Sequence, residues 1–250
     1  MNPYTRKTDS DHRADIVEVC RRIYAKGYAA ASDGNVSVRI GPDRILTTPS
    51  GLSKGYLTPD QVIVTDLEGR RLPPFTAANR ELKPSSEIKM HLEAYRQRPD
   101  IGAVVHAHPP VATACTLAGV SLARCVLPEV VLTLVAIPTA DYATPSTNEV
   151  PESIRELIRD YDALLLERHG ALTVGKDVYD AYFKLEKVEH TAEITLAARQ
   201  LGRVRGMASE EVRKIEGLRQ QMGLSRQGVD PRTCQECRVC ERSGRRRRER

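Results

Sequence analysis

The sequence predicts a domain of the α/β class, because helical and strand patterns alternate along its length. Residues 11–26 repeat apolar side chains at helical spacing, and Gly27 ends that pattern. Residues 36–48 alternate apolar and polar side chains around the turn Gly41-Pro42-Asp43, which predicts a hairpin. Residues 101–109 form a short apolar run with β-branched valines, as buried strands do. With 250 residues, the chain can form one large domain or two small ones.

Further helices and strands are expected between these segments. In the first half, residues 62–65 form a strand, the prolines of 70–84 make that stretch irregular, and a helix opens at 83–87 and runs to about Arg98. Ser85 and Ser86 suit the N-cap of that helix. In the second half we expect a helix at 110–118, strand segments at 128–131 and 134–137, a helix at 151–159 capped by Thr147 or Asn148, and strands at 162–167 and 171–174. Two helices follow, at 178–201 and from Ser209 to about Gly223.

The charge of the chain is concentrated at its end. Apolar residues make up 40% and charged residues 28% of the sequence, which is ordinary for a globular protein. The formal net charge is +5, but residues 231–250 hold eight arginines against three glutamates, so residues 1–230 are balanced. The main part of the chain therefore gives no electrostatic reason for nucleic-acid binding. We interpret the arginine-rich end as a solvated, disordered segment rather than a site for nucleic acid or an acidic partner.

The cysteines and the N-terminus favour a cytoplasmic protein. No apolar run is long enough to span a bilayer, so no membrane contact is expected, and residues 1–7 lack the apolar core of a secretory signal. Three cysteines lie among apolar residues and are expected to be buried, reduced thiols: Cys20, Cys115 and Cys125. Three others form a C-x2-C-x2-C motif near the end, at Cys234, Cys237 and Cys240. That spacing can bind metal, but no fourth cysteine is near, so we favour adventitious metal or none.

A pair of histidines ends the predicted strand at 101–109. Side chains alternate along a strand, so His106 and His108 point the same way. Neutral imidazole nitrogen is a preferred zinc ligand, and two rings at one strand end supply two-thirds of a zinc site. A lone histidine is more often a satisfied core residue. The His-x-His spacing, followed by two prolines, makes the two interpretations equally plausible before other evidence.

Two further residues extend this candidate metal site. His169 follows the predicted strand at 162–167 and has the same local setting as the histidine pair. Three histidines at two strand ends match the ligand count of a catalytic zinc with one position open. Glu87 lies in the first turn of a predicted helix, where the helix dipole alone explains a carboxylate. Its role therefore depends on whether the fold brings it near the histidines.

Small polar residues predict a phosphate site. Gly34-Asn35 precedes the predicted hairpin and Ser50-Gly51 follows it, so the two loops fall at the hairpin's open end. Glycines let backbone N–H groups approach an anion closely, and the start of the helix after Ser85-Ser86 adds free N–H groups. Each loop alone is weak evidence, because Ser, Asn and Gly dominate ordinary turns.

Taken together, these segments resemble the class II aldolase/adducin family, and within it the L-fuculose-1-phosphate aldolase type. The resemblance covers roughly residues 11–205, and the ordered set of motifs is more specific than any one of them. The motifs are Gly34-Asn35-Val36-Ser37-Val38-Arg39, Thr48-Pro49-Ser50-Gly51, Ser85-Ser86-Glu87, His106-Ala107-His108, Tyr142-Ala143-Thr144 and His169-Gly170.

The resemblance implies a fold, a cofactor and an assembly. The fold is α/β, with a central, mostly antiparallel β-sheet flanked by helices in three layers, and the assembly is a homotetramer with active sites between subunits. We expect residues 1–225 to form the catalytic domain and residues 226–250 to be a disordered Cys/Arg-rich tail. The metal ion is Zn²⁺, although Mn²⁺ or Co²⁺ also suits such ligands. The implied metal ligands are His106, His108, His169 and Glu87, and the implied phosphate-binding residues are Gly34, Asn35, Ser50, Gly51, Ser85 and Ser86.

The resemblance also implies a reaction. The family type cleaves a small phosphorylated sugar, a ketose 1-phosphate, between C3 and C4 to give dihydroxyacetone phosphate and an aldehyde. Zinc would stabilise the negative charge that develops on the substrate, and Glu87 would carry a proton to or from C3. The family's tyrosine, which protonates the aldehyde oxygen, is missing, because Leu127 falls at about its place. We therefore expect a small apolar aldehyde, as in cleavage of a 5-deoxy- or methylthio-ribulose 1-phosphate, with Glu129 or a water in place of the tyrosine.

Other reactions on the same scaffold remain alternatives. Ribulose-phosphate 4-epimerases usually carry Asp where Glu87 stands, so Glu favours an aldolase or a decarboxylase over an epimerase. Methylthioribulose-phosphate dehydratases and sugar-acid phosphate decarboxylases also use this scaffold. A non-catalytic binding protein like the adducin head domain would be expected to have lost the metal ligands, which are all present here.

Overall fold

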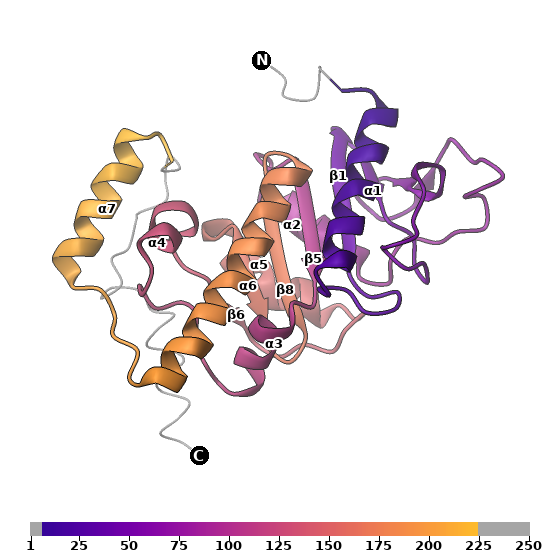
Figure 1. Ribbon diagram of the computed structural model, residues 1–250. Helices are drawn as coiled ribbons and strands as arrows, with labels where there is room; N and C mark the ends of the chain where they lie inside the picture. Colours follow the sequence, from indigo (N-terminus) through magenta and orange to yellow (C-terminus); the bar gives the residue numbers. More distant parts are fainter. Residues whose placement is uncertain (1–6, 225–250) are drawn as a thin grey trace.

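One mixed sheet organises the chain. The computed structural model describes residues 7–224 (Figure 1). Its eight-stranded sheet has the order β4-β3-β2-β1-β5-β8-β7-β6, and all neighbouring strands are antiparallel except β6 and β7. The strands are β1 (Asn35–Gly41), β2 (Arg44–Thr47), β3 (Ile63–Thr65), β4 (Arg71–Leu72), β5 (Ala103–Ala107), β6 (Thr139–Ala140), β7 (Ala163–Leu166) and β8 (Gly170–Gly175). The predicted α/β class with a central, mostly antiparallel sheet is confirmed.

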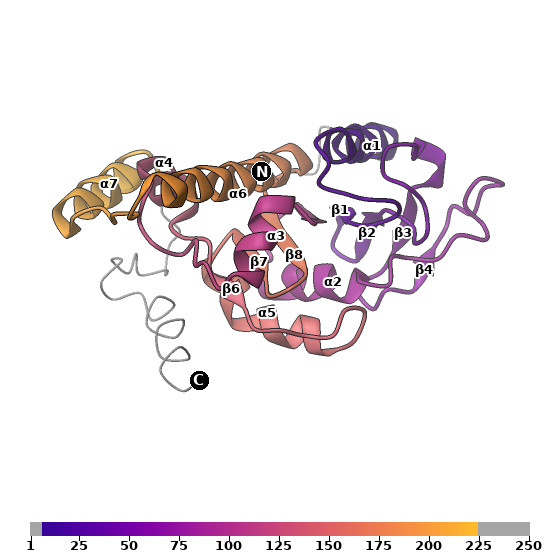
Figure 2. The ribbon, with the colours of Figure 1, turned by 60° about the horizontal axis from the view of Figure 1, so that its bottom comes forward.

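Helices cover both faces of this sheet, so the domain has three layers (Figure 2). One face carries α1 (Asp9–Ala25), α3 (Pro110–Leu117) and α6 (Val178–Leu201), and the other carries α2 (Ile88–Gln97) and α5 (Glu149–Asp160). A short 3-10 helix, η1 (Pro59–Gln61), precedes β3. The last two helices, α4 (Pro128–Leu134) and α7 (Ser209–Gln221), pack on each other to one side of the layers. None of the helices in residues 7–224 is both long and apolar enough to cross a membrane.

The alternation of side chains on β5 divides the interior into two cores. Ala103, Val105 and Ala107 join the cluster beneath α1, α3 and α6, whereas Val104 joins the cluster beneath α2 and α5. Side chains two residues apart share a face, so His106 lies on the α2 side, level with Val104. The central strand therefore carries its histidine toward the start of α2.

A buried carboxylate fixes the chain just after the histidine pair. Pro109 occupies the N-cap position of α3 and offers no side-chain hydrogen bond. Instead, Glu189 of α6 accepts hydrogen bonds from the backbone N–H groups of Val111 (2.9 Å) and Ala112 (2.7 Å). Burial raises the pKa of Glu189, although the two N–H donors oppose that shift. The first turn of α3 is thus held by α6, because free N–H groups at a helix start need acceptors.

The predicted strands between residues 128 and 137 are wrong. Residues 128–134 form the helix α4, with Pro128 in its first turn. Val135 ends that helix with φ +67°, and Ile137 makes only an isolated bridge. Short apolar runs carry no period that separates a strand from a buried helix. Here the packing of Val131 in a small apolar cluster shared with α7 accompanies the helical choice.

Two helix starts differ in detail from the predictions. Glu87, rather than Ser85 or Ser86, occupies the N-cap position of α2, and the Glu87 N–H donates to Ser85 Oγ over 3.3 Å. Asn148 lies at the N-cap of α5 without a side-chain bond, and Thr147 Oγ1 accepts from the N–H of Glu149 (3.2 Å).

Some of the other predictions agree with the structure, and others concern residues outside the described range. The predicted helix at 178–201 has the bounds of α6. Cys20, Cys115 and Cys125 are buried, free thiols, as expected. The predictions for the Cys/Arg-rich tail, including its disorder, its three cysteines and its boundary at 225/226, lie outside the described residues.

Candidate metal centre and phosphate loops

Three histidines and one glutamate converge at the ends of the central strands, near the start of α2. His106 is the residue before the last of β5, His108 directly follows that strand, His169 lies in the turn between β7 and β8, and Glu87 is the N-cap residue of α2. One ligand atom from each of these residues lies within 4.8 Å of the others. Glu87 Oε2 is 3.3 Å from His106 Nε2, and Glu87 Oε1 is 3.0 Å from His169 Nε2. The fold thus brings together four residues from three separate stretches of sequence.

The pairing of β5 with β8 sets the spacing of the rings. The register places Ala107 opposite Ala171, so the β7–β8 turn lies beside the histidine pair. That turn closes with a hydrogen bond from the His169 N–H to the Leu166 carbonyl (3.1 Å), with Arg168 in the left-handed region at φ +60°. The ring centroids of the three histidines are 4.8–5.0 Å apart.

Gly170 permits the close approach of these two segments. A Cβ atom at this position would lie 2.4 Å from the Ala107 carbonyl oxygen and 2.7 Å from Cδ2 of His108. Real Cβ atoms essentially never come within 3.0 Å of such atoms. Gly170 therefore lets β8 lie directly against the backbone that carries the histidine pair.

The hydrogen bonds of the rings leave nitrogen lone pairs facing one another. His106 Nδ1 lies 2.9 Å from the Ala171 carbonyl oxygen, which can only accept, so Nδ1 carries a proton, and in the neutral ring Nε2 carries the lone pair. His108 Nδ1 faces the Asp33 carboxylate at 3.5 Å, which favours the same tautomer there. The two Nε2 atoms are only 3.1 Å apart. Lone pairs at this distance repel unless a cation or proton lies between them.

The donor set fits a divalent metal ion. Glu87 Oε1 is buried and accepts no hydrogen bond of normal geometry within residues 7–224, although it lies 3.0 Å from His169 Nε2. Burial, together with the neighbouring His106 and His169, lowers the pKa of His108 to about 4. Burial would raise the pKa of Glu87, but interactions with His106 and then His169 outweigh burial and lower it. Neutral imidazoles and an ionised carboxylate are the forms that bind a metal.

The loops proposed for phosphate lie next to this cluster. Asn35 Nδ2 donates to Ser85 Oγ and to Glu87 Oε2, both over 3.1 Å. Ser50 N–H donates to the Lys83 carbonyl (2.9 Å), which joins the loop after β2 to the segment before α2. The loops at 34–35, 48–51 and 84–87 are therefore neighbours, and Asn35 links them to Glu87.

The remaining predicted phosphate residues border the same place. Gly34 has φ +73°, and a Cβ there would meet the His106 carbonyl oxygen at 3.0 Å, so the loop runs beside the cluster of three histidines and Glu87. Gly51 also has a positive φ, of +76°. Ser50, Gly51 and Ser86 are exposed to solvent, whereas Asn35 and Ser85 are buried.

A buried lysine supports one of these loops. Lys54 is 2% exposed, and its Nζ donates to the carbonyls of Ser32 (2.7 Å) and Leu52 (2.8 Å). It therefore ties the segment after Ser50-Gly51 to the segment before Gly34. Sequence reasoning gave Lys54 no role, and the only available signal was its position three residues after Gly51.

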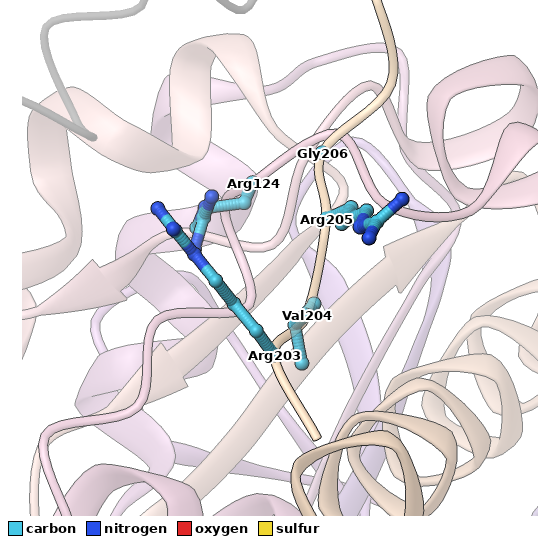
Figure 3. A pocket seen from close by; sticks show the side chains of 5 residues that line it. All are labelled: Arg124, Arg203, Val204, Arg205 and Gly206. Atoms are coloured by element: carbon cyan, nitrogen blue, oxygen red, sulfur yellow. The ribbon is translucent and has the colours of Figure 1, made fainter. Parts of the chain in front are cut away.

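A separate cavity of about 330 Å³ lies between the α6–α7 linker and the segment before α4 (Figure 3). Arginines dominate its lining, which consists of Arg124, Arg203, Val204, Arg205 and Gly206. Figure 3 shows the guanidinium groups of Arg124 and Arg203 close together, with Arg205 directed elsewhere. None of the residues predicted to bind metal or phosphate lines this cavity.

Comparison with known proteins identifies relatives for most of the chain. The family model for the class II aldolase and adducin N-terminal domain matches residues 14–196. An L-fuculose phosphate aldolase of Methanococcus maripaludis is 36% identical over 180 residues, which cover 72% of this chain and 93% of that protein. A 3-oxo-tetronate 4-phosphate decarboxylase of Haemophilus influenzae is 30% identical over 213 residues, which cover 84% of this chain and 98% of that protein.

Solved structures agree with the fold. An L-fuculose 1-phosphate aldolase superposes with a TM-score of 0.76 and 25% identity, over 86% of this chain and 98% of the other. The L-fuculose-1-phosphate aldolase of Thermus thermophilus gives a TM-score of 0.63 and 31% identity, over 75% and 94% of the two chains.

Proposed function

This chain belongs to the class II aldolase and adducin family, and on that basis we propose that it is a metal-dependent aldolase that reversibly cleaves a ketose 1-phosphate to dihydroxyacetone phosphate and an aldehyde. The observation that carries the proposal is the double contact of Glu87. Its carboxylate faces His106 and His169 on one side and accepts from Asn35 of the phosphate loops on the other. An acid or base at this junction would lie between the proposed metal ion and the proposed phosphate-binding loops, as the reaction requires.

We propose that His106, His108, His169 and Glu87 hold the ion, and that the ion is Zn²⁺, with Mn²⁺ or Co²⁺ as substitutes. When bound, a divalent ion supplies Lewis-acid stabilisation for the negative charge that develops on the substrate. The hydrogen bond from His106 Nδ1 to Ala171 keeps the ring oriented and the Nε2 lone pair available.

The phosphate loops would orient the substrate through its non-reacting end. In this proposal Asn35, Ser50 and Ser85 bind phosphate oxygens together with Gly34, Gly51 and Ser86. Binding energy from a remote phosphate can be used to position the reacting carbon atoms. The link from Asn35 to Glu87 (3.1 Å) would fix the distance between the phosphate and the acid/base group.

Glu87 would act on C3 of the substrate. During cleavage the C4 hydroxyl loses its proton, the C3–C4 bond breaks, and its electron pair stays with the C3 fragment. Glu87 is ionised in the free site, so it would receive that proton, relayed by Glu129 or a water molecule, and then donate it to C3, which completes dihydroxyacetone phosphate. A positioned proton donor of this kind is typically worth about 10²–10⁴ in rate.

Leu127 bears on the aldehyde end of the substrate. Leu127 is partly exposed, packs against the larger core and offers no proton donor where the related aldolases have a tyrosine. We therefore propose a small apolar aldehyde, as from 5-deoxy- or methylthio-ribulose 1-phosphate, over the L-fuculose product. Glu129 or a water molecule would then exchange the proton of the C4 hydroxyl.

A second candidate is decarboxylation of a 3-oxo sugar-acid phosphate. The decarboxylase relative aligns with 84% of this chain, against 72% for the aldolase relative from M. maripaludis. The chemistry is related, because loss of CO₂ also leaves an electron pair next to a carbonyl group. The same Glu87 would protonate the resulting carbon atom.

We also propose that the protein works as a cytoplasmic homotetramer with active sites between subunits. The family membership supports this assembly, and the balanced charge of residues 1–230 fits a small-molecule substrate rather than nucleic acid. Sedimentation equilibrium of the purified protein tests the tetramer directly.

One pair of assays tests the function. The zinc-loaded protein is incubated with dihydroxyacetone phosphate and a series of short aldehydes, and carbon–carbon bond formation is followed by ¹³C NMR. In parallel, release of CO₂ is measured from a 3-oxo-tetronate 4-phosphate. Product with a small aldehyde, abolished in Glu87→Gln, supports the aldolase. Absence of any new carbon–carbon bond refutes it, and CO₂ release would then select the decarboxylase.

A further inference from the structure

A row of buried polar contacts lies beneath the candidate site, between β1 and α2. It consists of Ser37 and Arg39 on the strand and His91 and Tyr95 on the helix, and we refer to it as the β1–α2 polar seam. We propose that this seam sets the position of α2 along β1 and thereby holds Glu87 beside Asn35 and His106. Ser37 and His91 are then positioning residues for the acid/base group, an inference that rests on the proposed function.

The contacts of the seam are direct and buried. Ser37 Oγ lies 2.7 Å from His91 Nδ1 and 3.0 Å from the Tyr95 hydroxyl. Arg39 Nη2 donates to the Tyr95 backbone carbonyl (2.7 Å), and its guanidinium lies over the Tyr95 ring, 4.8 Å from the centroid. Ser37 and His91 are both 0% exposed. Water therefore does not compete for the bond between them.

The contacts of the seam follow the contact between Asn35 and Glu87 at regular intervals along β1 and α2. Asn35, Ser37 and Arg39 are two residues apart and share one face of β1. Glu87, His91 and Tyr95 are four residues apart and share one face of α2. Two strand residues advance about 6.7 Å and four helix residues about 6.0 Å, so three successive contacts can stay in step. The contact between Asn35 and Glu87 is the first of these three.

The polarity of the seam contrasts with the opposite face of β1. The opposite face of β1 carries Val36 and Val38, which join the large apolar core beneath α1 and α6. Apolar contacts are non-directional and tolerate sliding, whereas hydrogen bonds fix one register. His91 Nε2 is buried with no hydrogen-bond partner within residues 7–224. Buried polar atoms are usually hydrogen-bonded, so the hydrogen bond of this ring depends on its other nitrogen, Nδ1. Ser37 is the side chain to which the His91 ring is hydrogen-bonded, through Nδ1.

A small slip of α2 would be enough to disturb the site. The Glu87 oxygens lie 3.0–3.3 Å from His169 and His106, and functional groups generally need placement within about 0.5 Å. A shift of one helical residue moves the backbone about 1.5 Å along the axis. Loss of the seam contacts should therefore displace Glu87 and disturb the candidate metal centre, although the ligand residues themselves are unchanged.

The test compares two faces of the same strand. Ser37→Ala removes both bonds of the seam serine, and Val38→Ala removes buried methyl groups from the neighbouring residue on the other face. For both variants and the wild type, zinc affinity is measured by competition with a chromogenic chelator, stability by urea unfolding, and kcat and KM with the substrate found active. His91→Phe removes the partner nitrogen, and His91→Asn restores a polar atom near the position of Nδ1.

We expect Ser37→Ala and His91→Phe to weaken zinc binding at least fivefold and to lower kcat at least tenfold. Val38→Ala should lower the urea midpoint as much as Ser37→Ala does, but it should leave zinc affinity and kcat within twofold of the wild type. His91→Asn should recover most of the loss in zinc affinity. Equal zinc affinities in Ser37→Ala and Val38→Ala would overturn the proposal.

These outcomes are separate from the failure of the proposed function. If no aldehyde gives a product, the aldolase reaction is refuted, yet the ranking of zinc affinities still decides whether the seam positions Glu87.

Discussion

Replacement of Gly170 by Ala provides the most direct test of how the fold builds the metal centre. The added Cβ would lie 2.4 Å from the Ala107 carbonyl oxygen and 2.7 Å from His108 Cδ2. Ordinary van der Waals contact begins at 3.4 Å, so β5 and β8 must separate by about 1 Å at this end. The cost is steric, because Gly170 is not among the residues with positive φ.

The expected effects follow from that separation. Forced repacking of a well-packed interior costs about 1–3 kcal/mol of unfolding free energy. His169 is adjacent to the substitution, so its ring should move relative to His106 by more than the roughly 0.5 Å that functional groups tolerate. We expect zinc affinity to fall at least tenfold, which corresponds to about 1.4 kcal/mol.

Gly102→Ala is the matched control. It lies at the other end of the β5–β8 pair, where a Cβ would meet the Lys176 carbonyl oxygen at 2.2 Å. It should lower the free energy of unfolding, measured in urea, at least as much as Gly170→Ala. Zinc affinity, measured by chelator competition, should stay within twofold. If Gly170→Ala binds zinc as tightly as the wild type, the strands do not set the geometry of the site.

Three more substitutions give distinct outcomes. Glu87→Gln should retain zinc but lower kcat by about 10²–10⁴, because an amide cannot carry the transferred proton; turnover and bound metal are measured on one sample. Ser50→Ala should raise KM for a phosphorylated substrate about tenfold with kcat unchanged, and an equal effect on an unphosphorylated analogue would exclude a phosphate contact. Glu189→Ala should cost about 3 kcal/mol in urea unfolding, because the Val111 and Ala112 N–H groups lose charged acceptors.

Strongly periodic elements could be predicted from the sequence. Helix α6 has the predicted bounds, and the hairpin of β1 and β2 turns where Gly41-Pro42-Asp43 predicted it. Alternation along β5 correctly placed the rings of His106 and His108 together. In these cases the local pattern and the tertiary structure favour the same answer.

Elements defined by their partners could not be predicted. Strands β4 and β6 have two residues each, and β6 exists through its parallel pairing with β7. The apolar run at 128–134 became a helix that packs on α7, a choice that short runs of Val and Leu do not reveal. Local propensity is a weak guide where packing against distant segments decides.

The candidate site shows the same division. The histidines could be identified from motifs at strand ends, but no local signal placed Glu87 among them, since its own position is explained by the helix dipole. The contact between Asn35 and Glu87 joins residues 52 positions apart and arises only from the docking of α2 on β1. Ser37 belongs to one of the family motifs, but the sequence assigned no positioning role to Ser37 or His91, although their spacing from Asn35 and Glu87 is visible once the two faces are aligned.

The wide separation of the four proposed ligands along the chain determines when the candidate site can form. A chain emerging from the ribosome presents Glu87 and the histidine pair well before His169. Until β7 and β8 join the sheet, only an incomplete set of ligands is available. If the four residues hold the proposed ion, tight metal binding should therefore appear only after β7 and β8 have joined the sheet, and bound metal would report that the sheet is complete.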